Sequence, residues 1–422
     1  MIKMKLHWQI LIAIIAAIVV GMLVDKNTAI GNIVFYDVFN FLGTLFLNAL
    51  KMIIVPLVVS SIICGISNIG SSKNLGRLGG KTIGFYMMSS LLAILIGIAF
   101  VNLLTPGIVN GEAAGNMLNL SSSSELSEQL TKIEGRGAGD IADVFLRMVP
   151  PNIVSAAANG QMLGLIFFGL LFGFFMSRIE EEQKKTLENF WQGVFQTMMA
   201  ITLLVMRFAP IGVFGLVAKT IAATGFEAFQ PLLLFFVTVL LALVFHAFIT
   251  LALLLKFIGK INPIHHYATM APAMLTAFST ASSSGTLPIT LKCVEEGAGV
   301  SNKTTSFVLP LGATINLDGT ALYECVAAMF IAQAYGLDLT ISTQFTIVLV
   351  ALLTSIGVAG IPAASLVAIS VILGAIGLPL EGIGMLLVTD RILDMLRTAV
   401  NVFSDSCCAL IVAKTEGEKG NY

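Results

Sequence analysis

Hydrophobic residues occur along the chain in long runs that are apolar on every face, and polar stretches separate these runs. A helix needs about 20 apolar residues to cross the hydrocarbon core of a bilayer. Lipid tolerates such a helix without a polar face, whereas water does not. The pattern therefore predicts membrane-spanning helices over residues 6–24, 39–69, 82–104, 150–177, 190–221 and 231–258.

The last part of the chain has a different pattern, with two stretches broken by Ser, Gly and Pro at 271–290 and 355–362. An apolar segment that contains an aspartate follows each of them, over 304–335 and 382–413. Interrupted segments at matching positions in two halves indicate inverted repeats around a binding site. Each broken stretch must enter and leave the membrane on one side, so we expect two re-entrant hairpins inside protein or along a wet cavity.

Basic residues concentrate in every second connection between the runs, and a serine-rich, acidic segment, 105–147, lies on the opposite side. Basic loops favour the cytoplasm, so we expect cytoplasmic termini and an extracellular 105–147 loop. The run 6–24 ends at Asp25 without a small-residue cleavage site, which favours a first transmembrane helix over a signal peptide. The orienting residues are Lys3, Lys5, Lys73, Arg77, Lys81, Arg178, Lys184, Lys185, Lys256 and Lys260.

Composition agrees with a polytopic membrane protein and excludes a soluble globular protein, a disordered chain and a nucleic-acid-binding protein. Hydrophobic residues make up 57% of the 422 residues and charged residues only 11%, against about 25% charged in a soluble domain. The 23 basic residues do not exceed the 24 acidic ones, so nothing draws the chain to nucleic acid. The five cysteines show no spacing typical of a metal site or a disulfide, and we expect them to be packing residues.

The final apolar segment carries a narrow polar stripe. Asp390, Asp394, Arg397, Asn401 and Asp405 are separated by four, three, four and four positions, which places them within an arc of about 80° on a helix. Such a stripe faces a cavity and not lipid. The alternative is an internal salt-bridge ladder, but here three acids face one arginine. The excess negative charge calls for cations from elsewhere, such as Na⁺, H⁺ or a substrate amine.

The residue types on this stripe suit an acidic amino acid. One guanidinium can hold a carboxylate with two hydrogen bonds, and Asp394, a turn away from Arg397, can hold an ammonium group. Asp405 lies further along the same face and offers the hard oxygen ligands that a small cation prefers.

A second polar interruption, at 316–320, divides the preceding apolar segment. Gly312 and Gly319 are expected to allow the helix to unwind there and so to free carbonyl oxygens. With Asn316 and Asp318 these oxygens would form a cation site. The alternative is a kinked helix around a satisfied, buried aspartate.

Three further polar features bear on the function. Glu324 lies deep in the same segment, where burial disfavours the charged carboxylate, so it is either a proton carrier or a neutral hydrogen-bonding residue. Serines 282–284 have no Gly-x-Ser-x-Gly context and no neighbouring base, so we expect no enzyme activity. These serines are better suited to offer hydroxyls and helix dipoles to a carboxylate. His246 is interpreted as a packed, hydrogen-bonded residue.

The stretches 279–288, 316–320, 355–362 and 390–402 together resemble the signature motifs of the dicarboxylate/amino acid:cation symporters. This is the glutamate transporter family, which includes the excitatory amino acid transporters and bacterial sodium/proton-glutamate symporters. Segments 51–56 and 208–214 also fit, so the resemblance covers nearly the whole chain.

The resemblance implies an all-α polytopic membrane protein with eight transmembrane helices, two re-entrant hairpins and inverted repeats. It implies a homotrimer in the cell membrane that works as an elevator. Scaffold helices one and two would occupy 1–81, transport-domain helix three 82–104, the extracellular loop 105–147, and scaffold helices four and five 148–221. The transport-domain core, 222–422, would hold helix six, hairpin one, helix seven, hairpin two as the gate, and helix eight.

Carried over by position, the family's substrate site falls on residues of both hairpins and of helices seven and eight. Arg397 would bind the side-chain carboxylate beside Thr320, and Asp394 would bind the amino group. Asn401 and Ser283 would hold the main carboxylate, with Thr398 nearby. The full set is Ser282, Ser283, Thr320, Ile361, Asp390, Asp394, Arg397, Thr398 and Asn401.

The resemblance also implies three sodium sites built from oxygen ligands, and no other cofactor. The first would comprise Asp405, Gly312, Asn316 and Asn401. The second would comprise Asp318, Asn316, Tyr86, Ser89 and Ser90. The third would comprise carbonyls of Thr314, Ser355, Ile356 and Val358.

The chain departs from the family pattern in places. Leu317 replaces a frequent methionine, and neither Ala281 nor Met395 is the arginine that many relatives carry at one of these two positions. Glu324 matches the position of the coupled proton in animal glutamate transporters, and the Ser-Ser-Ser hairpin favours sodium coupling.

Together the motifs predict symport of L-glutamate and/or L-aspartate with Na⁺ and H⁺. The rival functions are transport of neutral amino acids or C4-dicarboxylates on the same fold, and a channel.

Overall fold

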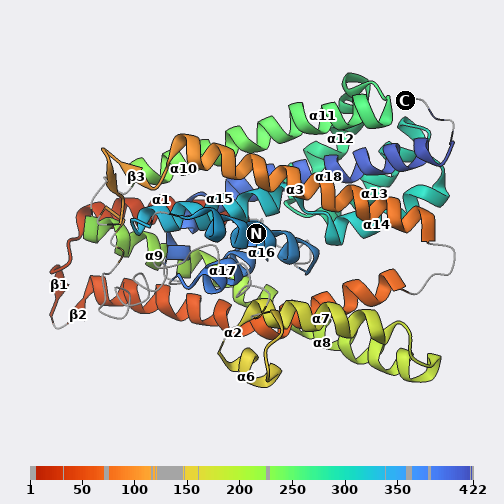
Figure 1. The fold of residues 1–422 in the computed structure, drawn as a ribbon. Helices are drawn as coiled ribbons and strands as arrows, with labels where there is room; N and C mark the ends of the chain where they lie inside the picture. The colour runs from red at the N-terminus through yellow and green to blue at the C-terminus, as the bar shows by residue number, and fades with distance from the viewer. Residues whose placement is uncertain are drawn as a thin grey trace, which may run out of the picture.

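The computed structural model describes the chain except residues 1–5, 32, 71–75, 116, 119, 121–145, 147, 160, 225–228, 338, 358–363, 379–381, 419 and 421–422. Long helices run roughly along one axis of the molecule (Figure 1). Two short antiparallel hairpins, β1 (Ala29–Ile30) with β2 (Ile33–Val34) and β3 (Ile108–Val109) with β4 (Glu112–Ala113), lie at helix connections.

The helices in the first half of the chain are α1 (Leu6–Leu23), α2 (Phe35–Gly70), α3 (Gly76–Leu104), α6 (Ile153–Ala158), α7 (Met162–Met176), α8 (Glu181–Arg207) and α9 (Ala209–Thr224). Those in the second half are α10 (Phe229–Phe245), α11 (Leu251–Leu254), α12 (Pro263–Thr280), α13 (Ser283–Lys292), α14 (Asn302–Ile315), α15 (Asp318–Ala334), α16 (Ile341–Gly357), α17 (Ala364–Ile376) and α18 (Ile383–Thr415). Three π-helical turns are η2 (His246–Thr250), η3 (Leu255–Gly259) and η4 (Cys293–Gly297).

Several of these helices can cross a membrane, as the apolar runs predict. Among the described residues, four helical segments are long and apolar enough: Arg77–Leu104, Phe229–Gly259, Asn302–Ala334 and Ile383–Thr415. A fifth is possible if Glu181–Val205 and Ala209–Ala223, which are bent by 54°, form one span. Shorter apolar helices are also present. The chain is thus a largely helical, polytopic membrane protein, while the number of eight spans stays a prediction.

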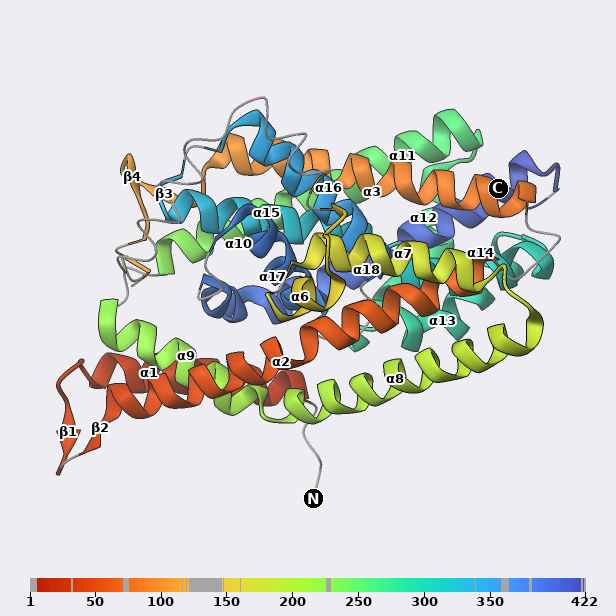
Figure 2. The same cartoon turned by 60° about the horizontal axis from the view of Figure 1, so that its bottom comes forward.

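The helices pack in two groups that lie side by side. In the first group α1 and α2 both pack on α9, and α2 also packs on α7 and α8. In the second group α15 contacts α3, α16, α17 and α18, and α18 also contacts α12 and α14. Figure 2 shows α1, α2, α8 and α9 along the lower side of the molecule and α3, α10 and α15 along the upper side. Helices α16, α17 and α18 bridge the groups, because they contact α2, α7 or α9.

Glycines allow the first group to pack closely. A Cβ on Gly215 of α9 would lie 2.8 Å from the Phe39 carbonyl oxygen and 2.9 Å from the Gly43 amide nitrogen of α2. Small residues at such contacts are typical of helices that associate in lipid, where close van der Waals packing replaces the hydrophobic effect.

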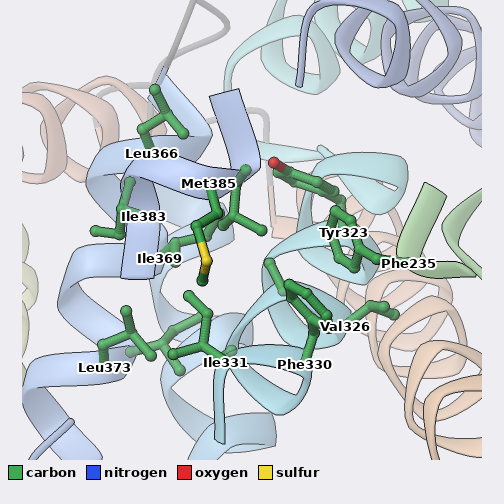
Figure 3. Close-up of a cluster of buried hydrophobic side chains, with 14 of the residues drawn as sticks. Phe235, Tyr323, Val326, Phe330, Ile331, Leu366, Ile369, Leu373, Ile383 and Met385 are labelled. Carbon is green, nitrogen blue, oxygen red and sulfur yellow. The ribbon is translucent and has the colours of Figure 1, made fainter. Parts of the chain in front are cut away.

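The second group has an almost fully buried core helix, α15, of which every residue except Thr320 is buried. Apolar side chains of α15 pack against α10 on one side and α17 and the start of α18 on the other; Figure 3 shows Phe235, Tyr323, Phe330, Ile369 and Met385 in this layer. The layer fixes α15 in position, and with it the polar side chains that α15 carries.

Two helical hairpins occur where the sequence predicts broken stretches. The first is α12 and α13, which contact each other. Ala281 turns the chain with a φ of 49°, and the Ser282 hydroxyl then caps α13 by accepting a hydrogen bond from the Gly285 amide. The second is α16 and α17, which also contact each other, but their connection, 358–363, lies outside the described residues.

The helix break between α14 and α15 lies where the sequence predicts it, but the expected role of the glycines is wrong. The interruption is at Asn316 and Leu317, with negative φ angles of −110° and −112°. Gly312 and Gly319 are helical. Their value is close approach: a Cβ would lie 2.4 Å from Asp405 Oδ1 at Gly312 and 2.9 Å from the Arg397 carbonyl oxygen at Gly319.

An ion-pair cluster joins the end of α18 to the start of α3. Glu416 pairs with Arg77 at 2.9 Å and with Lys81 at 2.5 Å. Hydrogen bonds from Arg77 and Lys81 lower the pKa of Glu416 to about 2. The pairing is therefore fully present above the ordinary glutamate pKa and is lost only as the pH falls toward 2.

Gly215→Val should lower the thermal unfolding temperature of the purified protein in detergent, because backbone atoms of α2 cannot rotate away from the new side chain. Overpacking of this kind costs about 1–3 kcal/mol. Gly80→Ala is the matched control, since a Cβ there meets nothing within 4 Å. An unchanged melting temperature for Gly215→Val would contradict the close α2–α9 contact.

Candidate functional site

The polar stripe on α18 forms a buried ion-pair network. Arg397 Nη2 donates to Asp390 Oδ1 at 3.1 Å and to Asp394 Oδ1 at 3.0 Å. Arg391 Nη1 donates to the other Asp394 oxygen, Oδ2, at 3.1 Å. Asp394 therefore lies between two guanidinium groups.

Arg397 is the central group of this network. Its side chain is 0% exposed and its guanidinium lies 3.8 Å above the centre of the Tyr323 ring. Nε and Nη1 are buried, and within the described part of the chain neither has a hydrogen-bond partner. A buried arginine with two such donors can bind a carboxylate strongly, because the cost of desolvating the cation has already been met by Asp390 and Asp394.

The prediction that the acids outnumber their cation partners is wrong for Asp390 and Asp394. Arg391 lies about 100° from Asp390 around the helix, outside the predicted stripe, but residues three apart on a helix are neighbours, so its long side chain reaches Asp394. The salt-bridge ladder that the sequence disfavoured is present for these two acids. Asp405 has no basic partner among the described residues and accepts a hydrogen bond from Asn316.

The next turn of α18 contacts the start of α15 through polar groups. Asn401 Oδ1 accepts from the Gly319 amide at 2.8 Å, and its Nδ2 donates to Thr320 Oγ1 at 3.1 Å. The Thr398 hydroxyl donates to the Asp394 carbonyl of its own helix at 2.7 Å. Thr320 and Asn401 therefore lie together beside the arginine network.

The remaining predicted substrate residues lie on the two hairpins. Ser283, buried, begins α13, which packs against α18, and Ser282 caps the same helix. The α13 N-terminus brings peptide N–H groups that suit an anion. Ile361 lies outside the described residues.

Asp318 is surrounded by hydroxyl donors from α3 and α18 and by an imidazole from η2. Oδ1 accepts from Ser90 at 2.6 Å and from Ser89 at 3.3 Å, both on α3. Oδ2 accepts from Ser404 of α18 at 2.6 Å and lies 3.2 Å from His246 Nε2, which must carry the proton to donate to a carboxylate.

Asn316 joins the Asp318 cluster to Asp405. Its Nδ2 donates to Asp405 Oδ1 at 2.9 Å and to Ser404 Oγ at 3.1 Å, while its Oδ1 accepts from Ser89 at 3.4 Å. Tyr86 lies at the same place, because a Cβ on Gly312 would be 2.6 Å from its hydroxyl; that hydroxyl donates to the Val308 carbonyl. The predicted members of the first two cation sites are therefore neighbours.

The predicted third cation set is only partly visible. Thr314 is exposed near the end of α14, and its hydroxyl donates to the Leu311 carbonyl at 2.8 Å. Ser355 and Ile356 lie in the last turn of α16, which contacts α14, and Val358 lies outside the described residues.

Glu324 is fully buried and has one close partner. Oε2 lies 3.3 Å from the Thr354 hydroxyl of α16, while Oε1 has no hydrogen-bond partner among the described residues. Thr354 also donates to carbonyls of its own helix at 2.9 and 3.0 Å. This environment favours a neutral carboxyl group over a charged one.

Sequence reasoning missed Arg391, Ser404 and Thr354 and underestimated His246. His246 is buried and hydrogen-bonded as predicted, but its partner is Asp318 in the candidate cation cluster. A signal was available for Ser404, which precedes Asp405 directly, and for Arg391, which is an arginine within an apolar run. No sequence spacing links Thr354 to Glu324, because they lie on separate helices.

The side chains around Asp318 and Asp405 offer serine and tyrosine hydroxyls, carboxylate oxygens and the Asn316 amide oxygen, the ligands that hard cations prefer, together with the His246 imidazole and the Asn316 amide nitrogen. No group of three or more His, Cys, Asp or Glu side chains converges within the described residues, as a transition-metal site would need. All five cysteines are free, and four of them are buried.

Comparison with known proteins gives full-length matches. The chain is 38% identical over 416 residues to the proton/sodium-glutamate symport protein of Geobacillus stearothermophilus, and the aligned region covers 99% of this chain and 96% of that protein. It is 37% identical over 418 residues to the proton/glutamate-aspartate symporter of Escherichia coli strain K12, covering 98% and 94%. It is 35% identical over 450 residues to excitatory amino acid transporter 3 of Mus musculus, covering 97% and 85%.

The family model for these proteins matches residues 6–415, which leaves out only the two ends of the chain. The polar stripe of α18, the break at Asn316 and both helical hairpins lie inside the matched range. The chain therefore belongs to the sodium:dicarboxylate symporter family.

Proposed function

We propose that this protein is a secondary-active symporter that takes up L-glutamate and/or L-aspartate together with Na⁺ and H⁺. The observation that carries the proposal is the buried Arg397, with two donors that have no partner among the described residues, directly beside Asp394. The two side chains offer opposite charges a few ångströms apart, as an acidic amino acid requires. The relatives from Geobacillus stearothermophilus and Escherichia coli, a glutamate and a glutamate-aspartate symporter, agree with this substrate class.

In this proposal the polar groups around Arg397 divide the contacts to the substrate among them. Arg397 binds the side-chain carboxylate beside Thr320, while Asp390 keeps the guanidinium oriented. Asp394 accepts hydrogen bonds from the amino group of the substrate. The α-carboxylate lies against Asn401, Thr398 and the α13 N-terminus, with Ser282 and Ser283 on one side and Ile361 of the second hairpin on the other.

The coupling ions occupy the oxygen clusters. One Na⁺ binds at Asp405 with Asn316, Gly312 and Asn401, and another at Asp318 with Tyr86, Ser89, Ser90 and Asn316. A third binds to carbonyls of Thr314, Ser355, Ile356 and Val358 beneath the second hairpin. A cation near Asp405 supplies the charge that the described residues do not give to this buried carboxylate.

The proton travels on Glu324. Its environment, with Thr354 as its hydrogen-bonding neighbour, accommodates the neutral carboxyl group. Protonation removes the cost of carrying an unpaired charge through an apolar layer.

The rival functions fit less well. A transporter for neutral amino acids would leave Arg397 buried without its counter-ion from the substrate, and a plain dicarboxylate would leave Asp394 without an amino group. A channel needs no paired carboxylate and ammonium contacts, and an enzyme would need a base and a nucleophile in one site.

The proposed architecture is a homotrimer with eight transmembrane helices and two re-entrant hairpins in each protomer, in the cell membrane with both termini in the cytoplasm. The scaffold (1–81 and 148–221) corresponds to the group around α2 and α9, and the transport domain (82–104 and 222–422) to the group around α15 and α18. Large apolar side chains are exposed along α1, α2, α8 and α9, as contacts with lipid or with other protomers require. The transport group moves across the membrane as an elevator.

Reconstitution tests the substrate and the role of Arg397 together. Proteoliposomes should take up labelled glutamate or aspartate but not serine under imposed sodium and proton gradients. Arg397→Ala should reduce acidic amino acid uptake at least about thirtyfold, because losing one partner of a buried charge contact costs about 2–5 kcal/mol. The exposed Arg178→Ala is the control. Normal affinity in Arg397→Ala would refute the site.

Glu324→Gln should leave substrate binding intact while it removes the pH dependence of net transport, because the amide imitates the neutral carboxyl group but cannot release a proton. Binding in detergent and uptake over a pH series measure the two effects. Glu296→Gln, which alters a glutamate that is 72% exposed, should keep the wild-type pH profile. If Glu324→Gln keeps it too, the proton is carried elsewhere.

Asp405→Asn should shift the sodium titration of uptake to higher concentration by at least about tenfold, the equivalent of about 1.4 kcal/mol. The amide keeps the shape of the side chain and loses its charge. Asp37→Asn, at the exposed start of α2, is the matched control. A sodium titration that overlays the wild-type curve would remove Asp405 from the cation site.

A further inference from the structure

Arg391 lies at the edge of the buried ion-pair network on α18. None of the proposed substrate contacts involves it. It precedes Asp394 by three residues, and its side chain is 19% exposed, whereas Arg397 is 0% exposed. Nη1 pairs with Asp394 at 3.1 Å, and Nε is buried without a partner among the described residues. Asp394 is the acid that holds Arg391 in place.

Asp394 divides its two oxygens between the two arginines. Oδ1 accepts from Arg397 and Oδ2 from Arg391, at 3.0 and 3.1 Å. Arg397 also pairs with Asp390, but Arg391 has no second acid partner among the described residues. The two contacts of Asp394 therefore differ. Arg397 divides its hydrogen bonds between Asp394 and Asp390, whereas Arg391 pairs with Asp394 alone among the described acids.

This difference matters when a substrate binds. The carboxylate then occupies Nε and Nη1 of Arg397, while the amino group approaches Asp394 Oδ1, which has to accept from both Arg397 Nη2 and the ammonium group. A carboxylate held at one oxygen only can rotate about its terminal torsion, since that torsion is broad. A second fixed bond at Oδ2 keeps the plane of the carboxylate constant, as outer partners do for ligand groups in other sites.

We propose that Arg391 is a positioning residue for amine recognition: it holds Asp394 Oδ2, so that Oδ1 alone passes between Arg397 and the amino group of the substrate. The inference rests on the proposed function, in which Asp394 binds that amino group. It also gives Asp394 a cation partner although neither Ala281 nor Met395 supplies one.

A purely structural role for Arg391 makes a different prediction. As a staple between neighbouring turns of α18 it would affect all ligands of the site equally. As a positioning residue it affects only ligands that carry an amino group, because Arg397 and Thr320 still bind the carboxylate of a ligand that lacks one.

The test compares L-aspartate with succinate, which has the same two carboxylates and no amino group. Both are measured as competitors of labelled aspartate binding to the full-length protein in detergent with saturating sodium. Arg391→Met keeps the length and apolar stem of the side chain but cannot bond to Asp394. It should weaken aspartate at least tenfold and leave the inhibition constant of succinate within twofold of wild type. Arg391→Lys, which keeps a cation within reach of Asp394, should recover part of the aspartate affinity.

Two controls define the result. Ile392→Met changes the adjacent side chain, which is 45% exposed, and should leave both ligands unaffected. If Arg391→Met does not yield folded protein, Arg391→Leu, which also cannot bond to Asp394, carries the same comparison, with the same expected loss for aspartate alone.

A parallel loss for aspartate and succinate, no change in either, or tighter binding of aspartate would each overturn the positioning role. Failure of the underlying function would look different, because wild-type protein would then bind no acidic amino acid. A wild type that binds aspartate and an Arg391→Met variant with an unchanged aspartate-to-succinate ratio would refute the role of Arg391 alone.

Discussion

The rest of the site depends on one constraint, which is that Arg397 is a cation with no solvent exposure inside an apolar helical layer. Asp390 and Asp394 on its own helix meet the cost of that burial, and the Tyr323 ring covers its face. The apolar layer between α15 and α10 holds the ring in place. The electrostatic environment of Arg397 on α18 therefore depends on the packing of α15. Gly319, whose missing Cβ lets α15 approach the Arg397 backbone, is part of the same solution.

The buried acids outside this network show how differently a protein can accommodate a carboxylate. Asp318 is surrounded by hydroxyl and imidazole donors, Asp405 shares an amide with Asn316, and Glu324 has a single threonine neighbour. The number of hydrogen-bond donors around a buried carboxyl group therefore falls from Asp318 to Asp405 and Glu324.

The sequence predicted the elements of this arrangement better than their contacts. The apolar runs, the two helical hairpins, the break at Asn316 and the polar face of the last helix all follow from local pattern, because a helix length and a repeat of 3.6 residues can be counted. The glycines at 312 and 319 were misinterpreted, because flexibility and close approach require the same residue and only the neighbouring helix distinguishes them. Arg391 could not be predicted from the helical angle alone, because its long side chain reaches beyond the face on which its Cα lies.

By itself, therefore, the sequence determined the membrane class, the helical elements and the family, and it identified which charges must be buried. Only the tertiary structure decided which partner each of those charges has. Asp318 meets Ser90 of α3 and His246 of η2, which lie 228 and 72 residues earlier in the chain, and Glu324 meets Thr354 of α16, 30 residues later. Whether a charge is buried can be predicted from the apolar segment that contains it. The free energy of that buried charge depends on the groups within a few ångströms, and these come largely from other helices.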